Sequence, residues 1–202
     1  MHELAPIVAA LDAHQPRRSR LRRRFQRAAV AVIVRESRQG AEVLLVERAH
    51  RPGDPWSGDM ALPGGRVDAL DEASASTAAC RETGEETGLA ITRANGIGRL
   101  SDRMTLNHRR RAPMIVSPFV YQLTDNPQIR LNHEIAGTRW LALAWLDEPT
   151  HRVTLRWRIG PVTLPMPCYH CDARRRLWGL TLSILDEFMR VARRNARHES
   201  SD

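Results

Sequence analysis

Two neighbouring stretches of the chain, Pro63–Asp71 (PGGRVDALD) and Arg81–Leu89 (RETGEETGL), carry the strongest structural signal in the sequence. The first is a glycine loop, whose backbone can approach a helix or a phosphate closely. The second includes the end of the segment 72–87, which is rich in Ala and Glu and contains no proline. Gly88 follows where a helix C-cap belongs. The sequence therefore predicts a glycine loop leading into a helix over residues 72–87.

Three glutamates near the end of that helix, Glu82, Glu85 and Glu86, are spaced i, i+3 and i+4 and so share one face. Each i,i+4 like-charge pair costs roughly 0.2–0.5 kcal/mol, and the helix C-terminus is already the negative end of the dipole. Gly84 costs about another 1 kcal/mol relative to Ala. A sequence that accepts these costs together is expected to hold a cation, and carboxylate oxygens suit hard divalent ions. An exposed acidic helix face is the alternative interpretation.

Hydrophobic periodicity predicts the rest of the architecture. Two strands are expected at 28–34 and 42–47, paired across a polar turn at 36–40. Further strands are expected at 97–100, 115–123 and 139–143. A hairpin of 152–159 and 162–166 is expected to turn at Gly160-Pro161. Helices are expected at 3–13 and 174–194, with a short helical turn at 145–148. Mixed strands with one early and one late helix favour an α/β layer fold.

The chain length and composition predict one folded domain. It has 202 residues, of which 42% are hydrophobic and 27% charged, enough for a single core. No apolar run approaches the roughly 20 residues that span a bilayer, and the N-terminal charges follow the apolar stretch, the reverse of a secretory signal. We therefore expect a cytoplasmic protein with no membrane partner.

The cysteines agree with a reducing compartment, because Cys80, Cys168 and Cys171 cannot build a disulfide framework. Cys168 and Cys171 form a C-x-x-C pair, but no second pair is present to complete a zinc site. We expect ordinary, semi-buried cysteines at both positions.

The charge balance favours anionic partners. Basic residues number 31 against 23 acidic ones, a net charge of +8, and every basic residue is Arg. The absence of Lys excludes lysine Schiff-base and Walker-type chemistry. The run 17–24 either holds RNA or is a solvated arm. Phe25 is its only neighbouring aromatic, so nucleic acid is not expected as a partner.

The two stretches quoted first resemble the Nudix box. The matching positions are Gly65, Arg81, Glu82, Glu85, Glu86, Gly88 and Leu89. Thr83 stands where the box has an apolar residue, and Asp71, followed by Glu72, stands at the spacing of the box's first glutamate. The interval from Gly65 to Arg81 is longer than in the standard box. The resemblance implies an α/β/α sandwich with a central mixed β-sheet and a catalytic loop-helix-loop.

The longer loop, of the form Pro-Gly-Gly-x-x-Asp-x-x-Asp at 63–71, is similar to that of the coenzyme A pyrophosphatase branch of Nudix hydrolases. Residues 44–49 (LLVERA) and 177–181 (LWGLT) also fit that branch, so the resemblance covers about residues 28–192. The branch has a segment close to His-x-Gly-Gln-Val before the loop, where this chain has Trp56–Met60 (WSGDM). Only the glycine matches, which keeps open another nucleotide such as ADP-ribose, NADH or a damaged nucleoside triphosphate.

The resemblance implies hydrolysis of the pyrophosphate bridge of a small nucleotide substrate with Mg²⁺ or Mn²⁺. Glu82 and Glu86 are then the main metal ligands, Glu85 is a third ligand or helps to activate water, and the Gly65 carbonyl contributes to the metal site. A homodimer is an arrangement that the resemblance allows. A non-catalytic Nudix-fold module that binds a nucleotide or RNA is a further alternative, and it predicts a broken glutamate cluster.

The general base is left open between Glu85, Glu134 and the loop residue His108. Arg81 is expected to face another way on the helix than the glutamates and to brace the glycine loop through Asp71 or Glu72, or else to form a surface ion pair.

Candidate substrate contacts are Arg48, Arg66 and the run Arg109–Arg111 for phosphate, and Trp56 for stacking on a base, with loop packing as its alternative. We divide the chain into a basic N-terminal extension (1–27), a Nudix domain (28–195) and a disordered tail (196–202).

Overall fold

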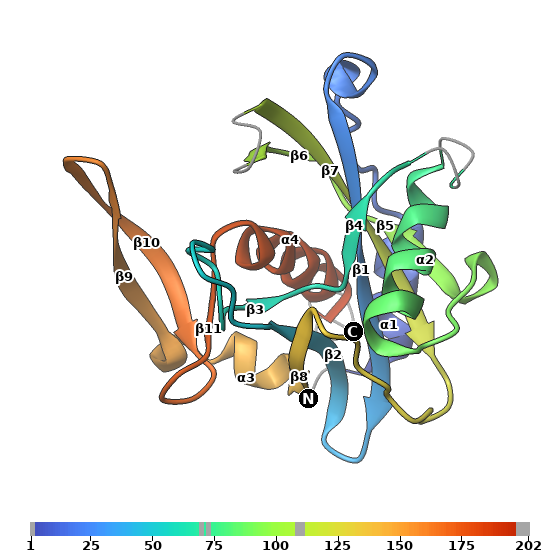
Figure 1. Ribbon diagram of the computed structural model, residues 1–202. Helices are drawn as coiled ribbons and strands as arrows, with labels where there is room; N and C mark the ends of the chain where they lie inside the picture. Colours follow the sequence, from blue (N-terminus) through green and yellow to red (C-terminus); the bar gives the residue numbers. More distant parts are fainter. Residues whose placement is uncertain (1–2, 69–70, 72–73, 108–111, 197–202) are drawn as a thin grey trace.

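The computed structural model describes residues 3–68, 71, 74–107 and 112–196 (Figure 1). Glu72, His108, the run Arg109–Arg111 and the tail from residue 197 onward lie outside the described residues. The described part is an α/β/α sandwich with a second, small sheet at one side. The predicted fold class is therefore confirmed.

An eight-stranded mixed sheet forms the centre of the sandwich, with the order β3-β2-β1-β7-β5. Off this path β4 pairs with β1, β6 with β7 and β8 with β2. The strands are β1 Gln26–Ser37, β2 Gly40–Arg48, β3 Met60–Ala61, β4 Gly64–Arg66, β5 Gly96–Arg99, β6 Arg103–Asn107, β7 Ala112–Leu123 and β8 Ile135–Ala142. Strands β1 and β7 are parallel, whereas the other pairs are antiparallel.

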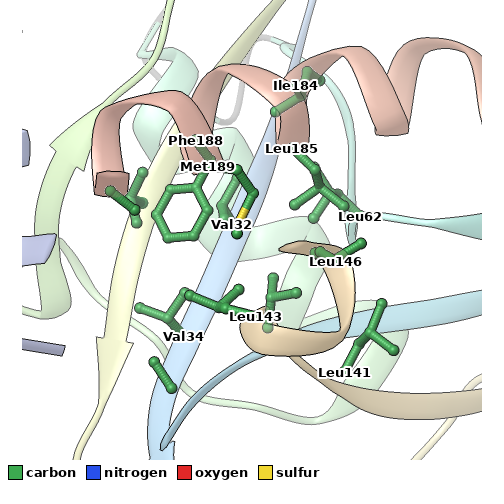
Figure 2. Packing of buried hydrophobic residues seen from close by; sticks show 14 of the residues in the cluster. Val32, Val34, Leu62, Leu141, Leu143, Leu146, Ile184, Leu185, Phe188 and Met189 are labelled. Carbon is green, nitrogen blue, oxygen red and sulfur yellow. The ribbon is translucent and has the colours of Figure 1, made fainter. Parts of the chain in front are cut away.

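Helices cover both faces of this sheet, because strand β1 has apolar side chains on both of its faces. They are α1 Leu4–Asp12, α2 Ala75–Thr87, α3 Leu143–Asp147 and α4 Gly179–Ala196, with short 3-10 helices at Arg20–Arg23, Arg93–Asn95 and Pro149–His151. Ala31 and Ile33 belong to the core cluster that includes α2, whereas Val32 and Val34 belong to the cluster that includes α1, α3 and α4. Figure 2 shows the second cluster, with Phe188 of α4 beside β1. This alternation is the period-2 pattern of a strand buried on both sides.

The second sheet has three strands in the order β11-β10-β9. Strands β9 (Arg152–Ile159) and β10 (Val162–His170) form a hairpin that projects from the domain, and β11 (Arg176–Trp178) joins it to α4 (Figure 1). Leu177 of β11 is fully buried in the main core. The predicted hairpin is confirmed.

The last helix differs from the prediction, because it begins at Gly179 rather than at residue 174. Gly179 has φ +61°, a conformation that interrupts a helix, and residues 176–178 pair with β10 instead. The strand at 103–107 was not predicted either; its residues Met104 and Leu106 are exposed, so no buried pattern marks it.

The N-terminal extension packs against the domain. Leu4, Ile7 and Leu11 of the predicted first helix are buried in the same core cluster as α4. Farther on, Ser19 donates its backbone N–H to Asp102 (2.7 Å), which fixes the backbone of the basic run. Its arginine side chains are mostly exposed. Across the residues described, no helix is both long and apolar enough to cross a membrane.

Candidate active site

The glycine loop lies between β1 and α2, and both glycines are needed for this close approach. Gly64 has φ +147°, and a Cβ there would lie 2.3 Å from the carbonyl oxygen of Ala29 on β1. A Cβ on Gly65 would lie 2.2 Å from the carboxyl carbon of Glu82 on α2. Any larger residue would therefore push the loop off the sheet or the glutamate out of place.

Helix α2 ends at Thr87 as predicted, but it begins at Ala75 rather than at residue 72. The Ser74 side chain accepts the N–H of Thr77 at the N-cap, and Gly88 takes a left-handed conformation (φ 71°) at the C-cap. Beyond the helix, Asn132 donates its N–H to the carbonyl of Glu86 (3.2 Å). That bond brings the loop that carries Glu134 to the end of the acidic helix.

Glu86 faces the glycine loop, where it accepts the backbone N–H of Gly64 (3.0 Å). The pKa of Glu86 is raised to about 7, mainly by burial and also by the nearby carboxylates Glu82 and Glu134, while the Gly64 N–H and the charge of Arg48 only partly oppose this rise. Glu86 is thus a carboxyl group with more negative charge around it than its hydrogen bonds compensate.

Arg81 does not face away from the glutamates, so this part of the prediction is wrong. Its guanidinium donates to Glu82 (3.0 Å) and to Glu85 (3.0 Å), because residues one and four positions along a helix lie within reach of so long a side chain. It also donates to both oxygens of Asp71 (3.0 and 3.2 Å) and to the carbonyl of Arg66 (3.1 Å). Arg81 therefore braces the loop through Asp71 while it also orients the two glutamates.

The carboxylates around Arg81 respond differently to it. Burial would raise the pKa of Asp71, which is fully buried, but the hydrogen bonds from Arg81 and from the N–H of Asp68 outweigh burial and lower it. For Glu82, burial outweighs the effect of Arg81 and raises the pKa. Asp71 is thus a structural partner of Arg81, and Glu82 keeps an unfavourable buried charge.

A polar cavity of about 50 Å³ opens beside the glycine loop. Its lining residues are Val46, Arg48, Ala49, Arg51, Ala61, Leu62, Gly64, Glu86, Glu134 and Ile135. Arg51 donates to Glu134 (2.8 Å), and this hydrogen bond lowers the pKa of Glu134. Arg48 is paired with Asp54 (2.6 Å). Two guanidiniums and two carboxylates from four segments therefore meet at one opening.

The structure brings most of the predicted residues together, but not all. Gly65, Arg81, Glu82 and Glu85 lie along the loop and helix, and Glu85 is the most exposed of the three glutamates, with 54% of its side chain accessible. Arg48, Glu86 and Glu134 share the cavity. Arg66 is exposed on β4 and Trp56 is half-buried in the loop after β2; neither is among the described residues that line the cavity.

Arg51 was missed by sequence reasoning. Its partner Glu134 is 83 positions away, so no local spacing could have paired them. The C-x-x-C cysteines are free thiols, and they are buried rather than semi-buried as predicted. Burial raises the pKa of Cys171 to about 11.

The donor set at the loop and helix fits a hard divalent cation. Its groups are the carboxylates of Glu82, Glu85 and Glu86 and the carbonyl of Gly65, all oxygen ligands, which Mg²⁺ and Mn²⁺ prefer. Burial leaves the charges of Glu82 and Glu86 uncompensated. In residues 3–68, 71, 74–107 and 112–196 no three acidic, His or Cys side chains already converge on one metal position. Glu82 and Glu85 are instead hydrogen-bonded to Arg81.

Together the fold and the site define an α/β/α sandwich in which a glycine loop, an acidic helix and an arginine-lined cavity are suited to a phosphate compound. The sequence profile of the NUDIX domain matches residues 25–158, and the chain belongs to the Nudix family. The resemblance stated from the two sequence stretches is thereby confirmed for the family.

Individual proteins resemble the chain more distantly. An uncharacterized protein of Schizosaccharomyces pombe is 38% identical over 111 residues, 53% of this chain and 33% of that protein, so the chain spans about a third of this curated relative. A solved MutT/nudix family protein from Enterococcus faecalis has a TM-score of 0.54 at 19% identity over 95% of this chain and 70% of that chain. An Ap4A hydrolase of C. elegans has a TM-score of 0.46 at 25% identity over 59% of this chain and 81% of that chain. The Enterococcus structure shares the fold.

Proposed function

We propose that the protein is a hydrolase of phosphoric anhydrides that depends on Mg²⁺ or Mn²⁺ and cleaves the pyrophosphate bridge of coenzyme A or a related nucleoside diphosphate derivative. The observation that carries this proposal is Glu86, a half-buried carboxylate with a raised pKa that lines a cavity with Arg48 and Arg51. An acidic helix face that served only solubility would be exposed and would not face a glycine loop.

The cation would be held by Glu82 and Glu86, with Glu85 and the Gly65 carbonyl as further ligands. When bound, it neutralises charge on the pyrophosphate and lowers the pKa of an attacking water. Gly64 supports this arrangement, because its N–H fixes the orientation of the Glu86 carboxylate.

The remaining residues act on the substrate and on water. The guanidiniums of Arg48 and Arg51 supply positive charge and planar hydrogen-bond donors for the phosphate oxygens. Glu134 lies in the same cavity with a lowered pKa, so it is ionised at neutral pH and can accept a proton from water once Arg51 turns toward the substrate. Arg81 acts indirectly, since it orients Glu82 and Glu85 and braces the loop.

Coenzyme A is the first substrate to test because Pro63–Asp71 and Leu177–Thr181 are similar to the coenzyme A branch. The second candidate is a Nudix hydrolase of another nucleotide, and the observation that favours it is the segment Trp56–Met60, which departs from that branch. This segment runs into β3, and the next residues, Ala61 and Leu62, line the cavity.

The proposal is tested by product analysis after incubation of the purified protein with Mg²⁺ and a panel of substrates. The panel holds coenzyme A, an acyl-coenzyme A, NADH, ADP-ribose and nucleoside triphosphates, with Glu86→Gln as the blank. Adenosine 3′,5′-bisphosphate plus phosphopantetheine is the expected product pair from coenzyme A. Cleavage of another compound would move the substrate to the second candidate. No cleavage at all would contradict hydrolysis and favour a nucleotide-binding module.

A further inference from the structure

The segment between β2 and β3, residues 49–59, forms one wall of the cavity, and we refer to it as the cavity loop. It begins next to Arg48 and contains Arg51, and both side chains line the cavity. Its two ends are joined by backbone hydrogen bonds, from Arg48 N–H to the Asp59 carbonyl (3.2 Å) and from Gly58 N–H to the Arg48 carbonyl (3.0 Å). The place of Arg48 therefore depends on how residues 58–59 are held.

Asp59 is a buried charge for which the proposed chemistry has no use. Only 4% of the residue is exposed. One carboxylate oxygen accepts a hydrogen bond from Nε of Arg176 (2.9 Å), and the other accepts one from the indole N–H of Trp178 (2.6 Å). Hydrogen bonds to an ionised group in a buried setting are among the stronger ones in proteins. The carboxylate thus has one good donor on each oxygen.

Both donors lie on β11, which is firmly placed. Trp178 pairs with Cys168 of β10, and its ring lies 4.3 Å from that of Trp157 on β9. Leu177, between the two donors, is fully buried. Asp59 consequently connects the cavity loop to β11 of the second sheet. Figure 1 shows β11 near β3, the strand that follows this loop.

We infer that Asp59 is a positioning residue for substrate binding: it fixes the cavity loop to β11 and so holds Arg48 and Arg51 at the cavity. This inference rests on the proposed function. It also gives a physical reason for the unusual segment Trp56–Met60, since a carboxylate at position 59 matches two donors that an amide could not serve equally. Asp59 itself lines no part of the cavity, so it acts through the loop backbone.

The test is Asp59→Asn, which keeps the size of the side chain but turns one acceptor oxygen into a donor. With the nucleotide that the wild type cleaves, we expect KM to rise about tenfold while kcat stays within about twofold, because binding is weakened without loss of the glutamates. Trp178→Phe, which keeps an aromatic side chain and removes the indole N–H donor, should also raise KM, by about threefold.

Glu187→Gln is the matched control, because Glu187 is also 4% exposed and also bonded to an arginine, but on α4. It should lower stability and leave KM unchanged. The inference is overturned if KM of Asp59→Asn rises less than about threefold, or if Glu187→Gln raises KM as much. If Asp59→Asn does not fold, KM of Trp178→Phe is compared with KM of Glu187→Gln instead, and an equal KM in the two variants overturns the inference.

Hydrogen exchange separates this inference from the proposed function. In Asp59→Asn the amides of residues 49–59 should exchange at least about tenfold faster, while those of 75–87 keep their rate. A wild type that cleaves nothing would refute the proposed function, and exchange would then decide whether Asp59 holds the loop. Unchanged exchange in residues 49–59 would overturn the inference.

Discussion

Two glutamates on two helices, the half-buried Glu86 on α2 and the buried Glu187 on α4, have opposite pKa shifts. Burial raises the pKa of both carboxyls, but Glu187 accepts hydrogen bonds from the backbone and hydroxyl of Ser101 (3.1 and 2.6 Å) and from Arg103 (2.6 Å), and these lower its pKa overall. Among the described residues Glu86 accepts a hydrogen bond from the N–H of Gly64 alone, and its pKa rises to about 7. Within the described part of the chain, Glu187 therefore has several hydrogen-bond donors where Glu86 has one.

This difference distinguishes a structural carboxylate from a candidate catalytic one. A fully bonded carboxylate contributes to folding, and its negative charge has nothing further to attract. A carboxylate buried with too few donors costs stability and is ready to bind a cation or a proton. Glu86 lies at the cavity, whereas Glu187 lies between α4 and the strand β6, so the comparison also locates the site.

The largest expected effect is that of Glu86→Gln on activity. Removal of this charge should lower kcat by about a hundredfold or more, since a predicted metal ligand is lost. The melting temperature should stay the same or rise, because a neutral amide is easier to bury and can still accept the Gly64 N–H. Steady-state kinetics and calorimetry measure the two. A large loss of stability would place Glu86 in the same structural class as Glu187.

Glu187→Gln should have the converse effect. Loss of its charge-assisted hydrogen bonds should reduce the free energy of unfolding by about 1.5–3 kcal/mol. The melting temperature would then fall by roughly 5–10 °C for a domain of this size. Turnover measured well below that temperature should match the wild type. A folded Glu187→Gln protein that had lost turnover would contradict the assignment of Glu187 as a structural carboxylate.

The smallest expected effect is on the pH dependence of stability. The pKa of Glu187 is lower in the folded state than its ordinary value of 4.5, so the unfolded chain binds more protons in that range. Its contribution is therefore complete above pH 4.5 and is lost as the pH falls through the folded-state pKa. Urea unfolding between pH 3 and 7 should show a shallower acid loss in Glu187→Gln than in the wild type. Parallel curves would contradict the lowered pKa.

Local signals in the sequence predicted much of the fold. The period-2 pattern of 28–34, the turn before β2 and the Gly160-Pro161 hairpin each depend on neighbouring residues, and the structure has all three. The errors occur where tertiary contacts decide. Residues 176–178 join β10 rather than α4, and β6 is a strand because β7 lies beside it, although its own pattern is not buried.

The candidate site also has features that local sequence signals predicted and features that only tertiary contacts decide. The spacing of Glu82, Glu85 and Glu86 is a property of the chain, because any helix here places them on adjoining positions of one side. The direction of Arg81 was predicted wrongly, since it depends on where Asp71 comes to lie after the loop folds back. Likewise, the Arg51–Glu134 pair depends on two loops that meet only in the folded domain.

The sequence by itself determined the glycine loop, the acidic helix and the family, because the close approach of backbone to helix requires glycine and the charge spacing follows from helical geometry. The tertiary structure alone decided which glutamate is under-bonded, which arginines reach the cavity and what Asp59 holds. These properties depend on burial and on donors contributed from distant segments, and neither exists until the chain has folded.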